Sequence, residues 1–184
     1  QEVKKFVDLK KNDLIIDIGS NDGNLLSFFK RNMRVLGITP EEIGKLAIKR
    51  GIPTILDYFN NKSRKKIINK YGKAKIITAT NVFAHIDNLN NLISNIKKCL
   101  DKDGVFISES HYLLKVISGV QYDTIYHEHM RYYSLTSLQK LFKKNNLHIF
   151  HAKEIPTHGG SIRVYVSNNR NIKETLEVKK ILKK

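Results

Sequence analysis

The chain has 184 residues, enough for one domain with a substantial core, and 41% of them are hydrophobic. This composition excludes wholesale disorder, and no apolar run approaches the ~20 residues that a membrane-spanning helix needs. The single cysteine, Cys99, excludes an internal disulfide and a cysteine-based zinc site. Residues 1–16 lack the apolar core of a signal peptide, so we expect a cytoplasmic protein.

Lysine and arginine outnumber aspartate and glutamate by 33 to 17, a net charge of +16. Such an excess attracts anionic partners, either nucleic acid or a small phosphate-bearing substrate. It also describes a lysine-rich surface in contact with solvent, because the basic residues are spread along the chain rather than interleaved with aromatics. The charge alone leaves both interpretations open.

Short apolar segments alternate with helix-like segments along the first 108 residues. The apolar runs are typical of buried parallel strands, and we predict strands at 14–18, 34–38, 53–56, 75–80 and 105–108. Between them we predict a helix opened by Asp22 and Gly23, then helices at 40–50, 62–71 and 89–100. Pro40 suits the first turn of its helix, and Asp103 with Gly104 signals a turn before the fifth strand.

The pattern changes after residue 110. Residues 111–134 form a long irregular segment, followed by a helix at 135–145 and strands at 147–153 and 161–166. Strand and helix in alternation predict an α/β fold with a doubly wound, mostly parallel sheet, and the two late strands predict an antiparallel C-terminal edge. We expect a single domain over residues 1–184, part of a longer protein, with ligands at the carboxyl ends of the strands.

A glycine turn, Asp17-Ile18-Gly19-Ser20-Asn21-Asp22-Gly23, follows the first predicted strand. Gly19 permits a tight turn and close approach of a ligand, and Gly23 allows close packing or opens space at the ligand. The spacing differs from the G-x-G-x-x-G of dinucleotide-binding proteins. It resembles the first motif of class I methyltransferases that use S-adenosylmethionine (SAM). That resemblance implies that the methionine part of SAM is held by Asp17, Gly19, Ser20, Asn21 and Gly23.

The same resemblance assigns the rest of the cofactor. The family usually has an acid at the end of the second strand to hold the ribose hydroxyls, but Thr39 stands there in this chain, with Glu41 and Glu42 nearby. Asp57, after the third strand, would reach the adenine amine. Asn81, after the fourth strand, would face the cofactor.

Residues Tyr126-His127-Glu128-His129 place four hydrogen-bonding side chains in consecutive positions, which is costly near a core unless each has a partner. This block, with residues 79–85 and 158–163 and the glycine turn, resembles the nucleotide-sugar C-methyltransferases over residues 13–166. Those enzymes transfer a methyl group from SAM to a ring carbon of a deoxy-keto-sugar carried on a nucleoside diphosphate. The family typically also has a cysteine-rich zinc segment before this core and an α/β lobe after it, and neither is present in these 184 residues.

The resemblance implies a role for each residue of the block. Carbon methylation needs removal of a proton next to a carbonyl, and a histidine is a natural base for it. We expect His129 to be the base, Tyr126 and Glu128 to contact the substrate, and His85 to lie near the enolate oxygen. His127 is expected to be structural. Further candidates for the pocket wall are His111, Tyr112 and His158, with Arg163 as a possible phosphate contact.

Other functions fit parts of the sequence. A hydrolytic metal enzyme could use the histidines and Glu128, but His-Glu-His lacks the His-Glu-x-x-His spacing, so we expect no metal. An amino-methylating nucleic-acid enzyme would carry an Asn/Asp-Pro-Pro-aromatic motif where Asn81-Val82-Phe83-Ala84 stands, so no nucleic-acid substrate is expected. A methyltransferase of another small molecule and a non-catalytic SAM-fold module remain open. The sequence predicts no oligomeric state and no membrane partner.

Overall fold

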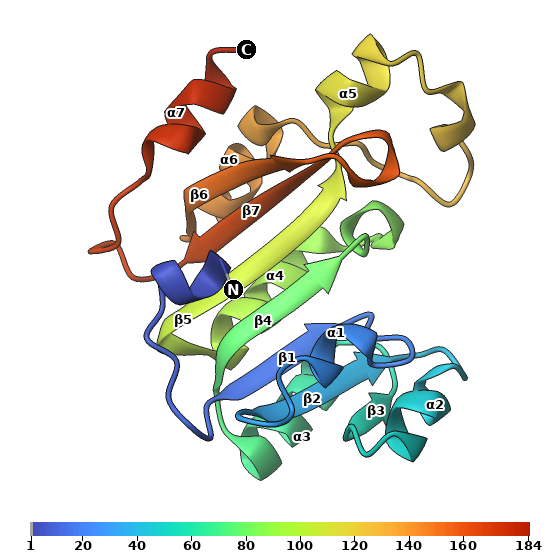
Figure 1. Ribbon diagram of the computed structural model, residues 1–184, viewed down its shortest axis with the longest axis vertical. Helices are drawn as coiled ribbons and strands as arrows, with labels where there is room; N and C mark the ends of the chain where they lie inside the picture. Colours follow the sequence, from blue (N-terminus) through green and yellow to red (C-terminus); the bar gives the residue numbers. More distant parts are fainter. Residues whose placement is uncertain (1) are drawn as a thin grey trace.

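Seven strands form one sheet in the order β3-β2-β1-β4-β5-β7-β6 in the computed structural model, which describes residues 2–184 (Figure 1). Strands β1 to β5 are parallel, and β7 runs antiparallel between β5 and the edge strand β6. The predicted fold, including its antiparallel C-terminal edge, is confirmed. The strands are β1 (Leu14–Ile18), β2 (Arg34–Thr39), β3 (Thr54–Leu56), β4 (Ala74–Thr80), β5 (Leu100–His111), β6 (His148–Ile155) and β7 (Ser161–Ser167).

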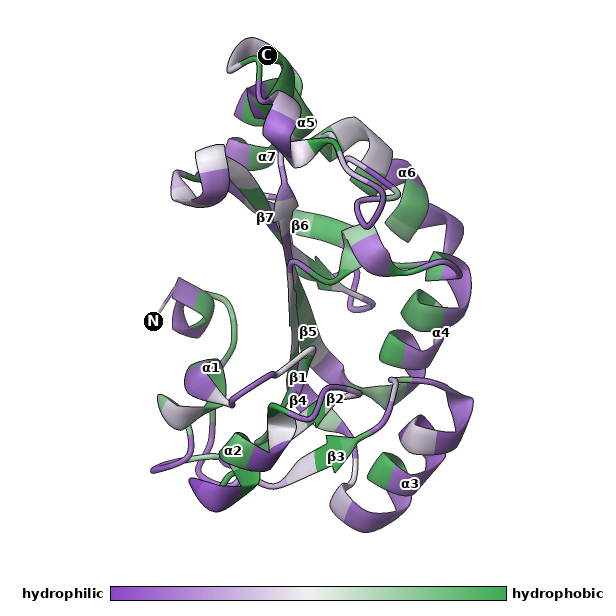
Figure 2. Cartoon of the chain, turned by 90° about the vertical axis from the view of Figure 1, so that its right-hand side faces the viewer, coloured by the Kyte–Doolittle hydropathy of each residue, from purple (hydrophilic) through white to green (hydrophobic). Residues whose placement is uncertain are grey.

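Helices cover both faces of the sheet, as Figure 2 shows edge-on: α3, α4 and α6 lie on one side, and α1, α2 and the N-terminal turn lie on the other. The α-helices are α1 (Asn24–Ser27), α2 (Gly44–Lys49), α3 (Asn61–Tyr71), α4 (Leu89–Cys99), α5 (Leu113–Ser118), α6 (Leu135–Lys144) and α7 (Leu176–Leu182). The 3-10 turns are η1 (Glu2–Lys5), η2 (Phe83–His85), η3 (Tyr122–Thr124) and η4 (Thr157–Gly159).

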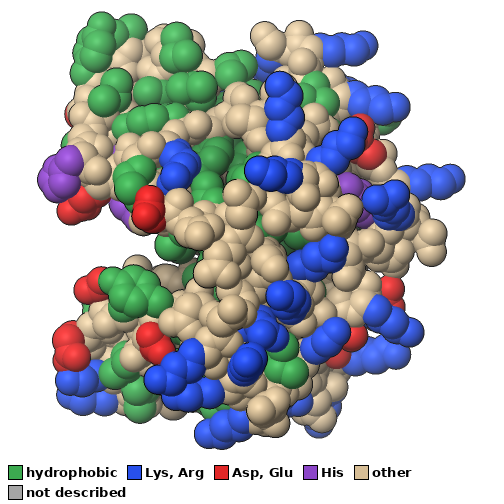
Figure 3. Space-filling view, turned by 180° about the vertical axis from the view of Figure 1, so that it is seen from behind, with side chains coloured by type: hydrophobic (Ala, Val, Ile, Leu, Met, Phe, Trp, Pro, Cys, Tyr) green, Lys and Arg blue, Asp and Glu red, His purple; other side chains and the backbone are tan. Residues whose placement is uncertain are grey.

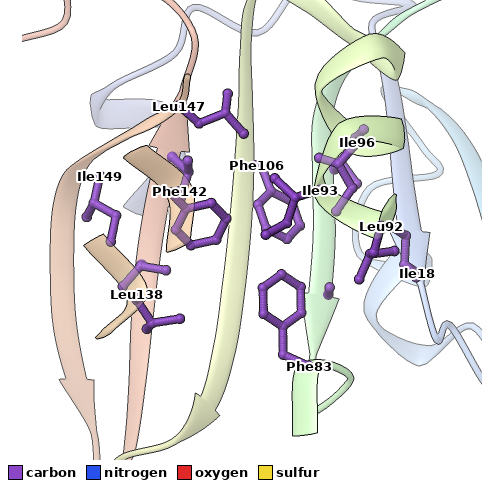
Figure 4. Packing of buried hydrophobic residues seen from close by; sticks show 14 of the residues in the cluster. Ile18, Phe83, Leu92, Ile93, Ile96, Phe106, Leu138, Phe142, Leu147 and Ile149 are labelled. Atoms are coloured by element: carbon purple, nitrogen blue, oxygen red, sulfur yellow. The ribbon is translucent and has the colours of Figure 1, made fainter. Parts of the chain in front are cut away.

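The larger core lies between the sheet and helices α3, α4 and α6. Three phenylalanines meet at its centre (Figure 4): the ring centroid of Phe83 is 5.7 Å from that of Phe106 and 6.1 Å from that of Phe142. All three rings are fully buried, and burial of a side chain of this size stabilises the fold by roughly 2–3 kcal/mol. Because Phe83 is the first residue of η2, this packing fixes η2 at the carboxyl edge of the sheet. Cys99 is also buried in this core, as predicted.

Two predicted boundaries are wrong. The helix expected from Pro40 begins at Gly44, because residues 41–46 are joined by i to i+3 hydrogen bonds such as Gly44 N to Glu41 O (3.0 Å) rather than by α-helical ones. The turn expected at Asp103-Gly104 lies inside β5. Its partner strand β4 pairs with Leu100 and then with Val105, so the intervening residues bulge out of the ladder.

The basic residues gather on the helices behind the sheet. Helices α3, α4 and α6 contain lysine and arginine but no aspartate or glutamate, and Figure 3 shows Lys and Arg side chains over this face. No helix within residues 2–184 is both long and apolar enough to cross a bilayer.

Candidate active site

A cleft of about 920 Å³ opens at the carboxyl ends of the parallel strands, where the fold predicts a ligand. In Figure 3 a notch lies at the left edge of the molecule, on the side to which these strand ends point. The cleft is lined by residues from the ends of β1, β2, β4 and β5 and from the loops after β1, β2, β3 and β4. The predicted site residues on its wall are Asp17, Gly19, Ser20, Asn21, Thr39, Asp57, Asn81, His85 and Glu128.

The glycine turn has the left-handed conformation at alternate residues: φ is +74° at Gly19, +47° at Asn21 and +78° at Gly23. A Cβ at Gly19 would lie 2.7 Å from Val82 Cγ2, so the loop after β1 and the loop after β4 touch where only glycine fits. Gly19 N donates to Ile38 O at 2.8 Å, which holds the turn against β2.

Of the two roles predicted for Gly23, the structure favours close packing, because Gly23 does not line the cleft. It precedes α1, and a Cβ there would lie 2.8 Å from Ile52 Cδ1 and 2.9 Å from Ala47 Cβ. Gly23 therefore lets α1 begin in close contact with α2, and the geometry gives it no contact with a cofactor.

Asp17 is a buried carboxyl group at the end of β1, and it is 5% exposed. The Thr78 hydroxyl of the adjacent strand donates to Asp17 Oδ1 at 2.6 Å. Burial raises the pKa of Asp17 to about 7, and the hydrogen bond from Thr78 offsets only part of that effect. A cationic group bound in the cleft would favour the ionised carboxylate.

Two polar side-chain atoms beside Asp17 have no partner within the described residues. Ser20 Oγ and Asn81 Oδ1 are both buried and make no hydrogen bond. A Cβ at Gly37 would lie 2.5 Å from Ser20 Oγ, so the glycine in β2 makes room for the serine side chain. Buried polar groups of this kind usually have partners, and these two are placed to bind a ligand in the cleft.

The acid expected at the end of β2 is replaced by a buried threonine. Thr39 is 1% exposed, and its hydroxyl accepts a hydrogen bond from Glu41 N at 3.4 Å. Glu41 lines the cleft, whereas Glu42 points to Lys45 and forms an ion pair with it. Asp57 lines the cleft and accepts from Tyr58 N at 2.7 Å. Of the two glutamates, only Glu41 is therefore placed to meet the cofactor.

The histidines predicted for catalysis lie together, although only His85 lines the cleft. The ring centroid of His129 is 5.1 Å from that of His85 and 4.2 Å from that of Tyr126. Tyr126 and His129 are absent from the cleft wall itself, so the predicted base stands next to the cleft rather than in it. Glu128, expected to contact the substrate, lines the cleft, and its backbone oxygen is 3.0 Å from His85 Nδ1.

Backbone carbonyl groups determine the tautomers of both rings. A carbonyl oxygen only accepts, so His129 Nδ1, 2.9 Å from Thr124 O, carries a proton. Neutral His129 then has an unprotonated Nε2, which accepts a hydrogen bond from the Tyr126 hydroxyl at 2.9 Å. By the same argument neutral His85 has its proton on Nδ1 and a free Nε2. The arrangement therefore provides two basic nitrogens beside one cleft.

The segment that carries this block is bonded to η2. Met130 N donates to Ala84 O at 3.0 Å, and the Tyr133 hydroxyl donates to Phe83 O at 3.1 Å. The Arg131 guanidinium also binds the backbone oxygens of Ile86 and Asp87. Residues predicted as irregular are thus held by backbone acceptors of a turn that is itself anchored in the core.

Two further candidate histidines, His111 and His158, lie near His129. The ring centroid of His111 is 5.0 Å from that of His129 and 6.0 Å from that of His158, so these two pocket-wall candidates lie beside the predicted base. Burial lowers the pKa of His111, and the neighbouring His129 and His158 lower it further, which favours a neutral ring. His127 is exposed, and Tyr112 is buried in the core. His127 therefore lies outside the group, as expected.

Glu109 and Gly37 are site residues that the sequence reasoning missed. Glu109, near the end of β5, is 6% exposed and lines the cleft. Arg163, expected as a phosphate contact, donates to Glu109 Oε2 from Nε at 2.8 Å and from Nη2 at 2.7 Å. A glutamate two residues after the end of the apolar run 105–107 was the available signal.

Comparison with known proteins agrees with this architecture. A family model described as a methyltransferase domain matches residues 1–152. "C-methyltransferase NovU" of Streptomyces niveus is 33% identical over 176 residues, which are 91% of this chain and 42% of that protein. The chain thus spans less than half the length of this relative.

Solved structures share the fold at low sequence identity. An S-adenosylmethionine-dependent methyltransferase from Clostridium acetobutylicum superposes with a TM-score of 0.68 at 13% identity, covering 90% of this chain and 87% of that chain. The O-methyltransferase NcsB1 of neocarzinostatin biosynthesis, solved with SAM and 2-hydroxy-5-methyl naphthoic acid, has a TM-score of 0.65 at 15% identity. The match covers 90% of this chain and 51% of that one. The predicted class, a SAM-dependent methyltransferase, is confirmed at the level of family and fold. Because the family model covers most of its length, the chain belongs to the methyltransferase-domain family.

Proposed function

We propose that this domain is the core of a SAM-dependent C-methyltransferase that acts on a keto-sugar linked to a nucleoside diphosphate. The observation that carries the proposal is the unprotonated His129 Nε2, fixed by Thr124 O and placed beside the cleft that contains Asp17. Methylation of a carbon next to a ketone requires a base to remove its proton, and His129 Nε2 is available for this role. The 33% identity to a C-methyltransferase supports the same reaction.

The cleft fits SAM on the side of β1 and β2. Asp17 offers a carboxylate that a cation would keep ionised, and Ser20 Oγ and Asn81 Oδ1 offer unused hydrogen-bonding atoms. Gly19 allows the backbone to approach the ligand, and Glu41 is the acid nearest the position of the usual ribose-binding residue. When bound, SAM supplies an electrophilic methyl group on a sulfonium.

The residues on the other side of the cleft would activate the sugar. His129 Nε2 takes the proton from the carbon next to the ketone, and the electron pair of that bond moves to the carbonyl oxygen. The His85 ring, held through Nδ1 on Glu128 O, would lie near the resulting enolate oxygen. The Tyr126 hydroxyl, displaced from His129 Nε2 by the substrate, becomes free to donate to the same oxygen. The carbanion equivalent would then form the new carbon–carbon bond while the bond from the methyl group to the sulfur of SAM breaks, which releases S-adenosylhomocysteine.

Mass spectrometry tests the proposal. The full-length protein is incubated with SAM and a panel of nucleoside-diphosphate 4-keto-6-deoxyhexoses, and the sugar product is expected to gain one methylene. Position-specific deuterium at the acidic carbon should be lost in the product. A methyl group found on oxygen, with the deuterium retained, would show that the reaction is O-methylation.

A further inference from the structure

Glu109 is a buried carboxylate on the cleft wall that the methyl transfer described above does not use. It is paired in register with Thr80 of β4, two residues beyond the Thr78 that binds Asp17 of β1. Neighbouring strands lie about 4.8 Å apart, so two strand spacings put Glu109 roughly 10 Å from Asp17 across the sheet. Glu109 therefore lies two strands away from Asp17, and its backbone oxygen accepts a hydrogen bond from Asn81 N at 2.9 Å.

The two oxygens of this carboxylate are unequally bonded. Oε2 accepts from Arg163 Nε at 2.8 Å and from Nη2 at 2.7 Å, whereas within residues 2–184 Oε1 accepts only from the Thr157 hydroxyl at 3.3 Å. A carboxylate can accept about four hydrogen bonds, so Oε1 keeps unused capacity. Oε2 is the fixed end of the group, and Oε1 is the end with capacity to bind a ligand.

Thr157 lies in the turn η4 and Arg163 lies in β7, just after it, and the residues between them are closely packed. Gly159 and Gly160 have φ of +72° and +119°, and a Cβ on Gly159 would lie 2.5 Å from Gln121 Oε1. Gln121 Nε2 donates to Gly159 O at 2.7 Å, which joins the turn to the segment that carries His129. The cost of desolvating a buried ion pair offsets much of the attraction between its charges, so the pair of Glu109 and Arg163 need not stabilise the fold. Its position on the cleft wall favours a role in binding.

We propose that Glu109 binds the substrate that receives the methyl group, by accepting hydrogen bonds at Oε1 from ring hydroxyls, with Arg163 as its positioning residue. Arg163 neutralises the carboxylate, so the pair selects neutral hydroxyl donors over ammonium groups. The site then recognises a polyhydroxylated ring, with its ketone at His85 and a hydroxyl at Glu109. This inference rests on the proposed function and adds to it the group that reads the hydroxyl pattern.

Steady-state kinetics with Glu109→Gln tests it. With a nucleoside-diphosphate 4-keto-6-deoxyhexose, the KM of the sugar should rise by about tenfold or more, as for loss of a hydrogen bond to a charged group, while the KM of SAM changes less than about twofold. Wild-type protein should also prefer this sugar over analogues that lack one ring hydroxyl. For one such analogue the preference should disappear in the variant.

Two further variants separate binding from folding. Glu154→Gln is the matched control, because Glu154 is a strand glutamate paired with Lys115 and Lys184 outside this cleft, and its KM values should match wild type. Glu109→Gln removes the nearer carboxylate partner of Arg163 and leaves Glu2 at 4.0 Å, so Glu109→Gln with Arg163→Gln is tested too, and it should show the same rise in KM. A sugar KM that is unchanged in both variants, or a KM of SAM that rises in parallel, overturns the proposal.

A binding measurement keeps the inference testable if no keto-sugar is methylated. Calorimetry titrates UDP-glucose, a hydroxyl-rich nucleotide sugar, into protein saturated with S-adenosylhomocysteine. Binding by wild type that weakens about tenfold in Glu109→Gln supports the hydroxyl contact even though the proposed reaction has failed. Equal binding, or none by wild type, overturns it.

Discussion

Asp17 and Thr78 form a 2.6 Å hydrogen bond between β1 and β4, at a depth that leaves Asp17 5% exposed. One hydroxyl does not replace the water that an ionised carboxylate loses on burial, so the pKa of Asp17 rises to about 7. Without a cation beside it, this carboxyl group is therefore half protonated near neutral pH. Its ionised form gains a partner when a cation binds, and the following predictions begin from this property.

Asp17→Asn should stabilise the protein in the absence of ligand. The folded pKa is about 7 and the ordinary value is 3.8, so stability falls as pH rises between these values. At pH 8 the cost is on the order of a few kcal/mol, and the variant should melt about 5–10 °C higher than wild type. The difference should shrink towards pH 4. Asp8→Asn, at an exposed position, is the control, and a lower melting temperature of Asp17→Asn at pH 8 would contradict the prediction.

Binding of SAM should become stronger as pH rises, whereas the stability of the ligand-free protein falls. Only the ionised Asp17 attracts the cationic ligand, so the association constant measured by calorimetry should rise about tenfold between pH 5.5 and pH 7. The α-amino group of the ligand stays protonated over that range. In Asp17→Asn the affinity should be low and nearly independent of pH. A wild-type affinity that is flat with pH would show that Asp17 does not meet the cation.

Gly19→Ala should abolish SAM binding, because its Cβ would lie 2.7 Å from Val82 Cγ2 at a φ of +74°. Gly51→Ala is the matched control: its φ is +72°, but nothing lies within 4 Å of the added carbon. The control should lose only about 1–2 kcal/mol of stability from backbone strain and keep its affinity. Equal affinities of the two variants would remove Gly19 from the cofactor site.

Glu41→Gln should weaken SAM binding by about tenfold if Glu41 replaces the missing acid at Thr39. The neighbouring Glu42 forms an exposed ion pair with Lys45, so Glu42→Gln should bind SAM as wild type does. The contact is identified by measuring how well adenine and adenosine compete with SAM, because only adenosine carries the ribose hydroxyls. A variant that discriminates between the two as well as wild type does would show that Glu41 does not bind ribose.

His129→Asn should lower kcat by about 10²–10⁴-fold, the usual contribution of a general base, with the Kd of SAM within about twofold. The reason is that His129 provides the unprotonated Nε2 but does not line the cofactor cleft. His127→Asn, two residues earlier and exposed, should retain wild-type turnover. Deuterium exchange of the substrate's acidic proton, followed without methyl transfer, measures the base directly, and exchange at the wild-type rate in His129→Asn would exclude it.

Local patterns were sufficient for the order of the strands, but not for α5, which lies in the segment predicted as irregular. The run Leu14–Ile18 has apolar, mostly β-branched residues on both faces, a pattern typical of a strand that is buried on both sides. It forms β1 with the predicted bounds. The helix at Pro40 and the turn at Gly104 were wrong because each boundary depends on a partner. Gly44 packs against Thr39 and Leu56, and β5 bulges because β4 dictates the register.

The sequence by itself determined the α/β architecture, the place of the glycine turn and the histidine block, because apolar periodicity and glycine conformations are local properties. Only the tertiary structure decided which groups share a cleft. In the folded chain Gly23 packs against α2, and Glu109 lines the cleft, where it pairs with Arg163. The hydrogen bond between Thr124 O and His129 Nδ1 also forms only in the folded chain. Such contacts join residues from separate strands and loops, and their distances follow from how the sheet is ordered, which no short stretch of sequence encodes.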